Sequence, residues 1–255
     1  MAMPKTLRQE VRMLKRRNER WQQGKVMVEG EKCIRELCDS AWEVERIYFT
    51  QAWSDSEFWE SSEKLRSSER MEVSAKDMDM MTAMKTAPGL LAVAHAPKSF
   101  DTEPTGTNLT LYLDNVADPG NVGTLIRVAD WFGLSGVVLS PKSADPLGPK
   151  SIQSAMGSTF HVPICVKSLD ELSEHLCSFV VGLDAGGENL FNEGHVSSPS
   201  LLVIGSESHG LSASVQASCH AIASIPGAGR AESLNASVAG AIAVASFIQQ
   251  GLTPN

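Results

Sequence analysis

The chain has 255 residues, of which 42% are apolar and 20% charged, and a formal net charge of −8. This length suits two domains of about 100 to 150 residues, or one large domain. No apolar run reaches the roughly 20 residues that a membrane span needs, and the charged N-terminus lacks the apolar core of a signal peptide. We therefore expect a cytoplasmic protein with no membrane partner.

The cysteines are odd in number and form no CxxC pair. A disulfide framework or a zinc site is therefore not expected, and no metal is predicted. Buried free thiols are the simplest interpretation of Cys33, Cys38, Cys165, Cys177 and Cys219.

Charge is distributed unevenly along the chain. Residues 5–25 hold eight basic side chains against Glu10 and Glu19. Helical spacing places Leu7, Val11, Leu14 and Trp21 on one face, which leaves the basic side chains on the other. A solvated helix face would look the same, but a phosphate-binding surface is the sharper hypothesis. Its candidate residues are Arg8, Arg12, Lys15, Arg16, Arg17 and Arg20.

Residues 1–97 alternate between expected helices and strands, which predicts a small α/β domain. A capping box at Ser74–Asp77 opens the last of its helices. After the basic helix, the expected strands are 26–28, 46–50, 71–74 and 90–94, and the expected helices are 31–38, one within 54–66, and one from residue 74.

Residues 98–108 contain proline and threonine and no large aliphatic residue, which is typical of a linker. A second domain is expected over 109–255, with near-continuous apolar strands that favour a mostly parallel sheet covered on both faces. A helix is predicted over 121–132, with Gly133 as its C-terminal stop. The expected strands are 109–113, 136–139, 179–183, 201–204 and 221–225.

Three polar, glycine-bearing loops follow apolar runs in this second domain. They are residues 118–123, 205–212, and 225–226 continuing to 232–235. Glycine allows backbone to approach a ligand closely, and ligands of α/β proteins bind at the carboxyl ends of strands. The loops therefore predict one small-molecule pocket.

Several common ligand classes do not fit these loops. A dinucleotide site needs G-x-G-x-x-G after the first strand, whereas the candidate at 227–232 comes after the last strand and ends in Glu232. The chain has no Walker-type Gly-Lys-Ser/Thr. Ser206 and His209 share one loop without an orienting acid, so they do not form a hydrolase triad.

The loops resemble the three motifs of the SpoU/TrmH family of RNA ribose 2′-O-methyltransferases, within the SPOUT superfamily. Residues 118–127 are similar to the first motif, 205–212 to the second and 225–239 to the third. A further similarity, at 154–158, lies between the first two motifs. The N-terminal residues 28–30 and 89–93 resemble the family's substrate-binding domain.

This resemblance implies a fold and partners that periodicity alone does not. It implies a deep trefoil knot in the C-terminal α/β domain and an L30e/L7Ae-like N-terminal domain. It also implies S-adenosylmethionine as cofactor, a homodimer with the active site at the subunit interface, and RNA as substrate, with 23S-type rRNA favoured over tRNA. The alternative is a catalytically inactive knotted RNA-binding protein that acts in ribosome assembly.

The resemblance also assigns residues. Those matching the family's catalytic positions are Asn121, Arg127, Glu207, Ser233 and Asn235. Those matching its cofactor pocket are Leu183, Asp184, Gly205, Ile225 and Leu234. Asp118, Ser208 and Gly227 depart from the usual motifs, which leaves RNA choice and loop shape open.

The last helix carries an apolar stripe flanked by small residues, which suits a knot, a dimer interface or an ordinary core helix equally well. The stripe consists of Leu234, Val238, Ile242, Ala245 and Ile248.

Overall fold

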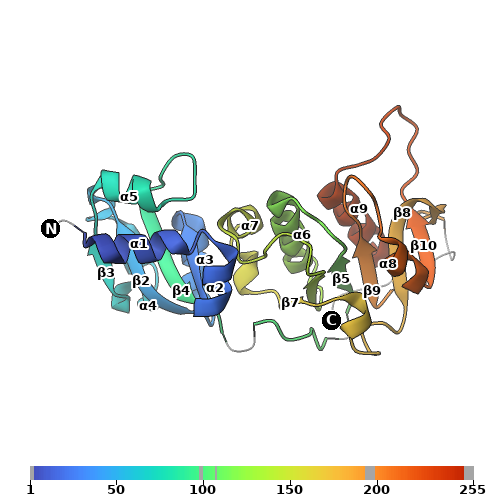
Figure 1. The fold of residues 1–255 in the computed structure, drawn as a ribbon, viewed down its shortest axis with the longest axis horizontal. Coiled ribbons are helices and arrows are strands. Elements are labelled where there is room, and N and C mark those ends of the chain that lie inside the picture. The colour runs from blue at the N-terminus through green and yellow to red at the C-terminus, as the bar shows by residue number, and fades with distance from the viewer. Residues whose placement is uncertain (1–2, 98–99, 107, 193–198, 250–255) are drawn as a thin grey trace. The chain divides into compact units, whose positions relative to one another are not determined.

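The computed structural model describes residues 3–97, 100–106, 108–192 and 199–249. They form two compact units: a first unit of residues 1–99 with 145–161, and a second unit of residues 100–144 with 162–255. Each unit has its own sheet (Figure 1). No helix within the described residues is long and apolar enough to cross a membrane.

The boundary between these units differs from a simple cut at a linker, because residues 145–161 belong to the first unit. Within that unit, the helix of this segment packs against the strand Lys25–Glu29. The predicted domains 1–97 and 109–255 stay a prediction, and residues 98, 99 and 107 of the predicted linker lie outside the described residues.

The first unit is α/β, with the sheet order β1-β4-β2-β3. Only the β2–β3 pair is parallel. Its strands are β1 (Lys25–Glu29), β2 (Glu43–Phe49), β3 (Arg70–Glu72) and β4 (Leu90–His95). Its helices are α1 (Lys5–Met13), α2 (Arg17–Gln23), α3 (Glu31–Asp39), α4 (Glu63–Ser67), α5 (Ala75–Met81) and α7 (Pro149–Ala155), with 3-10 turns at Gln51–Trp53, Glu57–Glu60 and Ser158–Phe160.

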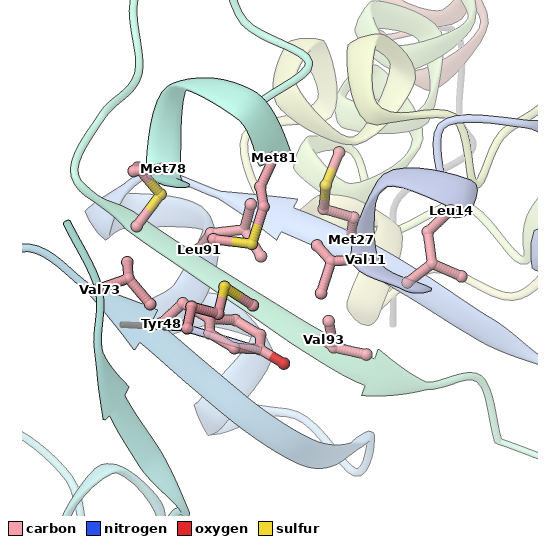
Figure 2. Close-up of a cluster of buried hydrophobic side chains, with 10 residues drawn as sticks. Val11, Leu14, Met27, Tyr48, Val73, Met78, Met81, Leu91 and Val93 are labelled. Carbon is pink, nitrogen blue, oxygen red and sulfur yellow. The ribbon is translucent and has the colours of Figure 1, made fainter. Parts of the chain in front are cut away.

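A buried cluster joins α1 and α5 to one face of this sheet (Figure 2). Val11 and Leu14 come from α1 and the turn after it, while Met78 and Met81 come from α5. They pack with Leu91 and other side chains of β1, β2 and β4, all removed from water. The N-cap half of the predicted capping box is present, since the Asp77 amide donates to Ser74 Oγ (3.1 Å). Asp77 Oδ2 accepts from the Ser74 hydroxyl (2.7 Å), whereas a full capping box would have it accept from the Ser74 backbone amide.

The predicted single basic helix is two helices, which corrects the sequence-based expectation. The chain leaves helical geometry at Arg16, whose ψ is 132°. This interruption frees the carbonyl of Leu14, which then accepts a hydrogen bond from Arg20 Nη1 (2.7 Å). The buried Arg20 guanidinium replaces the helical bond that the break removes.

The second unit is built on six strands in the order β10-β8-β9-β5-β6-β7, and all neighbouring strands are parallel. Its strands are β5 (Thr110–Leu113), β6 (Gly136–Leu139), β7 (Ile164–Val166), β8 (Val180–Asn189), β9 (Leu201–Ile204) and β10 (Ala221–Ser224). Its helices are α6 (Pro119–Trp131), α8 (Ala213–Ser218) and α9 (Ala236–Gln249), with a 3-10 turn at Leu169–Glu171.

The central strands β5, β6 and β9 are buried on both faces, as their continuous apolar sequences predict. On one face, α6 and α9 approach so closely that a Cβ on Gly240 would lie 2.5 Å from Leu125 Cδ2. The other face packs Val203 with Val215 of α8. The parallel α/β fold is thus confirmed, and the trefoil knot stays a prediction.

Arg20 is 3% exposed and forms an ion pair with Asp145, whose side chain is 7% exposed. Arg20→Met would leave that carboxylate buried without its cation, so we expect the free energy of unfolding to fall by about 3 to 5 kcal/mol. Urea denaturation followed by circular dichroism measures the change. Glu31→Gln, which breaks the exposed pair with Arg35, is the control and should stay within about 0.5 kcal/mol of the wild type. Equal losses in both variants would contradict a buried pair.

Candidate active site

The first predicted loop forms the N-terminus of α6. Asp118 is its N-cap, and Asp118 Oδ1 accepts hydrogen bonds from the amides of Gly120 (2.6 Å) and Asn121 (3.1 Å). Pro119 follows at the first helical position, where its missing N–H costs nothing. Asp118, one of the departures from the family motif, therefore has a local role as a helix cap.

Asn121 is the residue at which the three predicted loops meet. Its Nδ2 donates to Glu207 of the second loop, and its Oδ1 accepts from Asn235 Nδ2 of the third loop (3.0 Å). Residues far apart in sequence are thus joined through a single carboxamide. The convergence of the three loops, predicted from the sequence, is present in the geometry.

The orientation of both carboxamides follows from the start of α9. Asn235 Oδ1 accepts from the amides of Ser237 (3.0 Å) and Val238 (3.3 Å), which makes Asn235 the cap of that helix. Because a backbone N–H can only donate, the oxygen of Asn235 must face the helix and its nitrogen must face Asn121. Asn121 then presents its own nitrogen to the Glu207 carboxylate.

The second loop is a tight turn closed by reciprocal backbone bonds between Ser206 and Gly210 (3.0 and 2.9 Å). A Cβ on Gly205 would lie 2.3 Å from the carbonyl carbon of Gly210, so only glycine fits there. Gly210 has a φ of +64°. Ser208, which departs from the family motif, is not among the non-glycine residues with positive φ, so its backbone conformation is an ordinary one.

The predicted cofactor residues border this turn on the adjoining strands. Leu183 pairs with Ile204 in the sheet, which places the following residue, Asp184, beside the second loop. A Cβ on Gly210 would lie 3.0 Å from Asp184 Oδ2. Ile225 directly follows β10, and Leu234 directly precedes the α9 cap. Leu183, Asp184 and Ile225 are half-buried, and Leu234 is 45% exposed.

Arg127 and Ser233 are exposed, and within the described parts of the chain neither side chain forms a hydrogen bond or an ion pair. Arg127 lies on α6 six residues after Asn121, on the exposed face that also carries Thr124 and Trp131. The structure therefore brings together Asn121, Glu207 and Asn235, and leaves Arg127 and Ser233 open to a ligand.

The candidate basic surface is smaller than the sequence predicts. Arg20 is buried, and Arg8 is paired with Asp77. Lys15 Nζ donates to the Thr82 carbonyl, and burial lowers its pKa. Arg20 is therefore withdrawn as a phosphate contact, because its guanidinium does not reach solvent. The exposed members are Arg12, Lys15, Arg16 and Arg17, and of these Lys15 already has its ammonium group bonded to Thr82.

The buried polar residues that support the loops at the ends of β5 and β6 were not predicted from the sequence. Asp114, the first residue after β5, is 2% exposed and accepts a hydrogen bond from the amide of Ser212 (2.6 Å). Ser140 and Ser143, after β6, are also buried and bond to the turn that follows Asp114. An acidic residue at the carboxyl end of a buried strand was the available signal.

All five cysteines are free; Cys33, Cys38 and Cys165 are buried, and Cys177 and Cys219 are half-buried. Burial raises the pKa of Cys33 to about 11 and that of Cys165 to about 12, so these thiols stay protonated near neutral pH. In the described residues, no group of three or more His, Cys, Asp or Glu side chains is placed to hold a metal ion.

Comparison with known proteins places this α/β unit and its three joined loops in a known class. The family described as SpoU rRNA Methylase matches residues 108–245, more than half of the chain, and the chain belongs to this family. The MRM3-like substrate binding domain matches residues 8–92.

Among curated relatives, an uncharacterized tRNA/rRNA methyltransferase of Mycolicibacterium smegmatis is 34% identical over 71% of this chain and 61% of its own length. One of Mycobacterium ulcerans is 32% identical over 72% of this chain and 63% of its length. The chain thus spans about six-tenths of the length of these relatives.

Solved structures match almost the whole chain. The SpoU methyltransferase AviRb of Streptomyces viridochromogenes, in complex with AdoMet, is 26% identical with a TM-score of 0.86, covering 99% of this chain and 100% of that one. A putative TrmH-family RNA methyltransferase of Porphyromonas gingivalis is 30% identical, with a TM-score of 0.82 and coverage of 97% and 98%. An AdoMet-bound rRNA methyltransferase of Sinorhizobium meliloti is 26% identical, with a TM-score of 0.83 and coverage of 98% and 97%.

Two substitutions at Asn235 separate its two bonds. Asn235→Asp keeps the oxygen that caps α9 and loses the donor to Asn121, so the free energy of unfolding should stay within about 0.5 kcal/mol of the wild type. Asn235→Ala loses the cap as well and should cost about 1 kcal/mol. Urea denaturation distinguishes the two, and equal stability of both variants would contradict the capping role.

Proposed function

We propose that the protein transfers a methyl group from S-adenosylmethionine to a ribose 2′-hydroxyl of structured RNA, with 23S-type ribosomal RNA as substrate. The observation that carries the proposal is the link from Asn121 to both Glu207 and Asn235, which joins three loops at the carboxyl edge of a parallel sheet. Membership of the SpoU rRNA Methylase family and two AdoMet-bound structural neighbours support it.

The residues at this edge fit the proposed cofactor. Leu183, Ile225 and Leu234 offer apolar surface that is not fully buried, as an adenosyl group requires. Gly205 and Gly210 have no Cβ atoms, so a ligand can approach their backbone closely. At Gly227 there is open space, since even a Cβ would meet nothing within 4 Å. S-adenosylmethionine bound there would supply the methyl group.

The role of the protein in such a reaction is mainly positioning. Methyl transfer needs the ribose oxygen in line with the methyl–sulfonium bond, and holding two reactants in this way can supply roughly 7 to 11 kcal/mol of the barrier. Asn121 and Asn235 keep the loops in register, and Glu207 orders the second loop through Asn121. Ser233, which is exposed beside them, is available to orient the substrate.

Arg127 binds the phosphate next to the target ribose in this proposal. A guanidinium is effectively always protonated, so it is unsuited to take the proton of the 2′-hydroxyl. Its planar donors instead suit a bidentate grip on phosphate and stabilisation of the developing alkoxide. The phosphate or solvent then receives the proton.

The first unit contributes RNA contacts through Arg12, Arg16 and Arg17, whose side chains are exposed. The match to an MRM3-like substrate binding domain supports this assignment.

A homodimer and a trefoil knot complete the proposal. The predicted stripe of the last helix is not its core face, because the residues buried there are a different set: Ala236, Ser237, Gly240, Ala243, Val244 and Phe247. Val238 is 48% exposed, and Ile242, Ala245 and Ile248 are half-buried. An apolar helix face left partly in water supports a second copy of the chain as its partner.

Mass-spectrometric mapping of ribose methyls, in RNA from cells with and without the protein, tests the activity and the substrate together. The proposal expects one or more methyls to disappear from 23S-type rRNA. Loss from tRNA instead would change the substrate. If no methyl is lost and calorimetry finds no S-adenosylmethionine binding, the alternative of an inactive RNA-binding protein takes its place.

Arg127→Lys keeps the charge and removes the bidentate geometry. We expect turnover to fall about 100-fold, the scale of losing an aligned donor to a developing oxyanion, while cofactor affinity is unchanged. Single-turnover methylation and calorimetry measure the two quantities. Arg66→Lys, at an exposed arginine of α4, is the control. Near-normal turnover of Arg127→Lys would show that a simple charge suffices.

Replacing Arg12, Arg16 and Arg17 with Gln should weaken RNA binding uniformly across sequences. Each lost phosphate contact should reduce the slope of log affinity against log salt by about 0.7 to 0.9. Filter binding at several salt concentrations measures the slope. Arg66→Gln removes an exposed cation elsewhere in the same unit and should leave it unchanged. An unaltered slope in the triple variant would remove α1 and α2 from the RNA-binding surface.

A further inference from the structure

The carboxylate of Asp114 is buried at the carboxyl end of β5, where it contacts the end of the second loop. It is 2% exposed, and among the described residues it forms no ion pair. Its Oδ2 accepts from the Ser212 amide (2.6 Å), and its Oδ1 accepts from Asn115 Nδ2 (2.9 Å). A buried carboxylate is costly unless hydrogen bonds compensate it, so these two donors hold Asp114 in place.

The backbone on the β5 side of this contact is firmly fixed. Asn115 has a φ of +55°, a conformation that asparagine tolerates better than most residues. Its amide donates to Ser140 Oγ (2.9 Å), and the next amide, of Val116, donates to Ser143 Oγ (3.1 Å). Ser143 Oγ in turn donates to the carbonyl of Leu113 (2.9 Å). Two buried hydroxyls thus brace the chain on both sides of Asp114.

Ser212, the other end of the contact, is the residue at which the second loop ends and α8 begins. Reciprocal bonds between Ser206 and Gly210 close the loop on itself, so apart from the bond between Asn121 and Glu207 its orientation depends on its two ends. One end, Gly205, is held by β9 in the sheet, where Ile204 pairs with Leu113. The Ser212 end is held by Asp114.

We propose that Asp114 is a positioning residue, whose bond to the Ser212 amide sets the orientation of the 205–211 loop and so of Glu207 and the cofactor-binding backbone. This inference rests on the proposed function for the identity of the ligand. Asp114 does not itself contact the ligand in this proposal; it affects ligand binding only by positioning the 205–211 loop.

The principal test uses Asp114→Asn in the full chain, because an amide cannot accept at both of its positions. Without ligand, amide hydrogen exchange in residues 206–212 should become about tenfold faster, since one charge-assisted bond is weakened. The dissociation constants of S-adenosylmethionine and of S-adenosylhomocysteine, measured by calorimetry, should both rise about tenfold.

Asp101→Asn is the matched control. Asp101 Oδ1 also accepts a backbone amide, that of Val166 (2.6 Å), in the same unit but beside β7. This variant should change neither the exchange of residues 206–212 nor cofactor affinity. Ser212→Pro is the second test variant, in case Asp114→Asn does not fold. The native φ of Ser212 is −66°, which proline adopts, and the substitution removes the donor itself.

The possible results distinguish a failure of the role proposed for Asp114 from a failure of the proposed methyltransferase function. Unchanged affinity in Asp114→Asn with a lowered melting temperature would make Asp114 merely structural and overturn the proposal. A loss for the cationic S-adenosylmethionine alone, with the neutral S-adenosylhomocysteine unaffected, would show a charge effect and also overturn it. If the wild type binds neither compound, the proposed function fails, while faster exchange in Asp114→Asn still supports the loop contact.

Discussion

The candidate site depends on one carboxamide, that of Asn121, which must donate to Glu207 and accept from Asn235 at the same time. Asparagine can do this because its amide carries a donor and an acceptor on one rigid plane. The cap of α9 decides which way the plane faces, since Asn235 Oδ1 is already committed to backbone amides. A helix start and a loop contact are therefore set by the same side chain, and the three loops are mutually dependent.

Periodicity predicted most of the secondary structure. The strands of both units and the helix α6 appear near the expected positions, because buried parallel strands are continuous apolar runs and α6 carries a strong N-cap. The strand β7 and the helices α7 and α8 are short, and they were not anticipated. The segment expected to hold one helix within residues 54–66 contains a 3-10 turn and the short α4 instead.

The remaining differences are tertiary in origin. The bond from Arg20 to the Leu14 carbonyl is local, but the burial of Arg20 depends on Asp145, which is 125 residues away in sequence, so nothing near residues 14–16 reveals it. The same holds for Asp114 and Ser212. In α9, small residues that looked like flanks of the apolar stripe form the core face, because Gly240 must admit Leu125 of α6. The residue types of the loops could be read from the sequence, whereas the contacts between their side chains depend on tertiary packing.

The inclusion of residues 145–161 in the first unit means that the chain passes between the units more than once. A fragment ending at the predicted linker would keep Arg20 but lack Asp145 and α7, so it would expose the surface of β1 that α7 covers and bury a cation without its counter-ion. We therefore expect that a single cut at residues 98–108 would not yield an autonomously folding N-terminal module. The first unit also includes residues 145–161, which lie in the C-terminal part of the sequence.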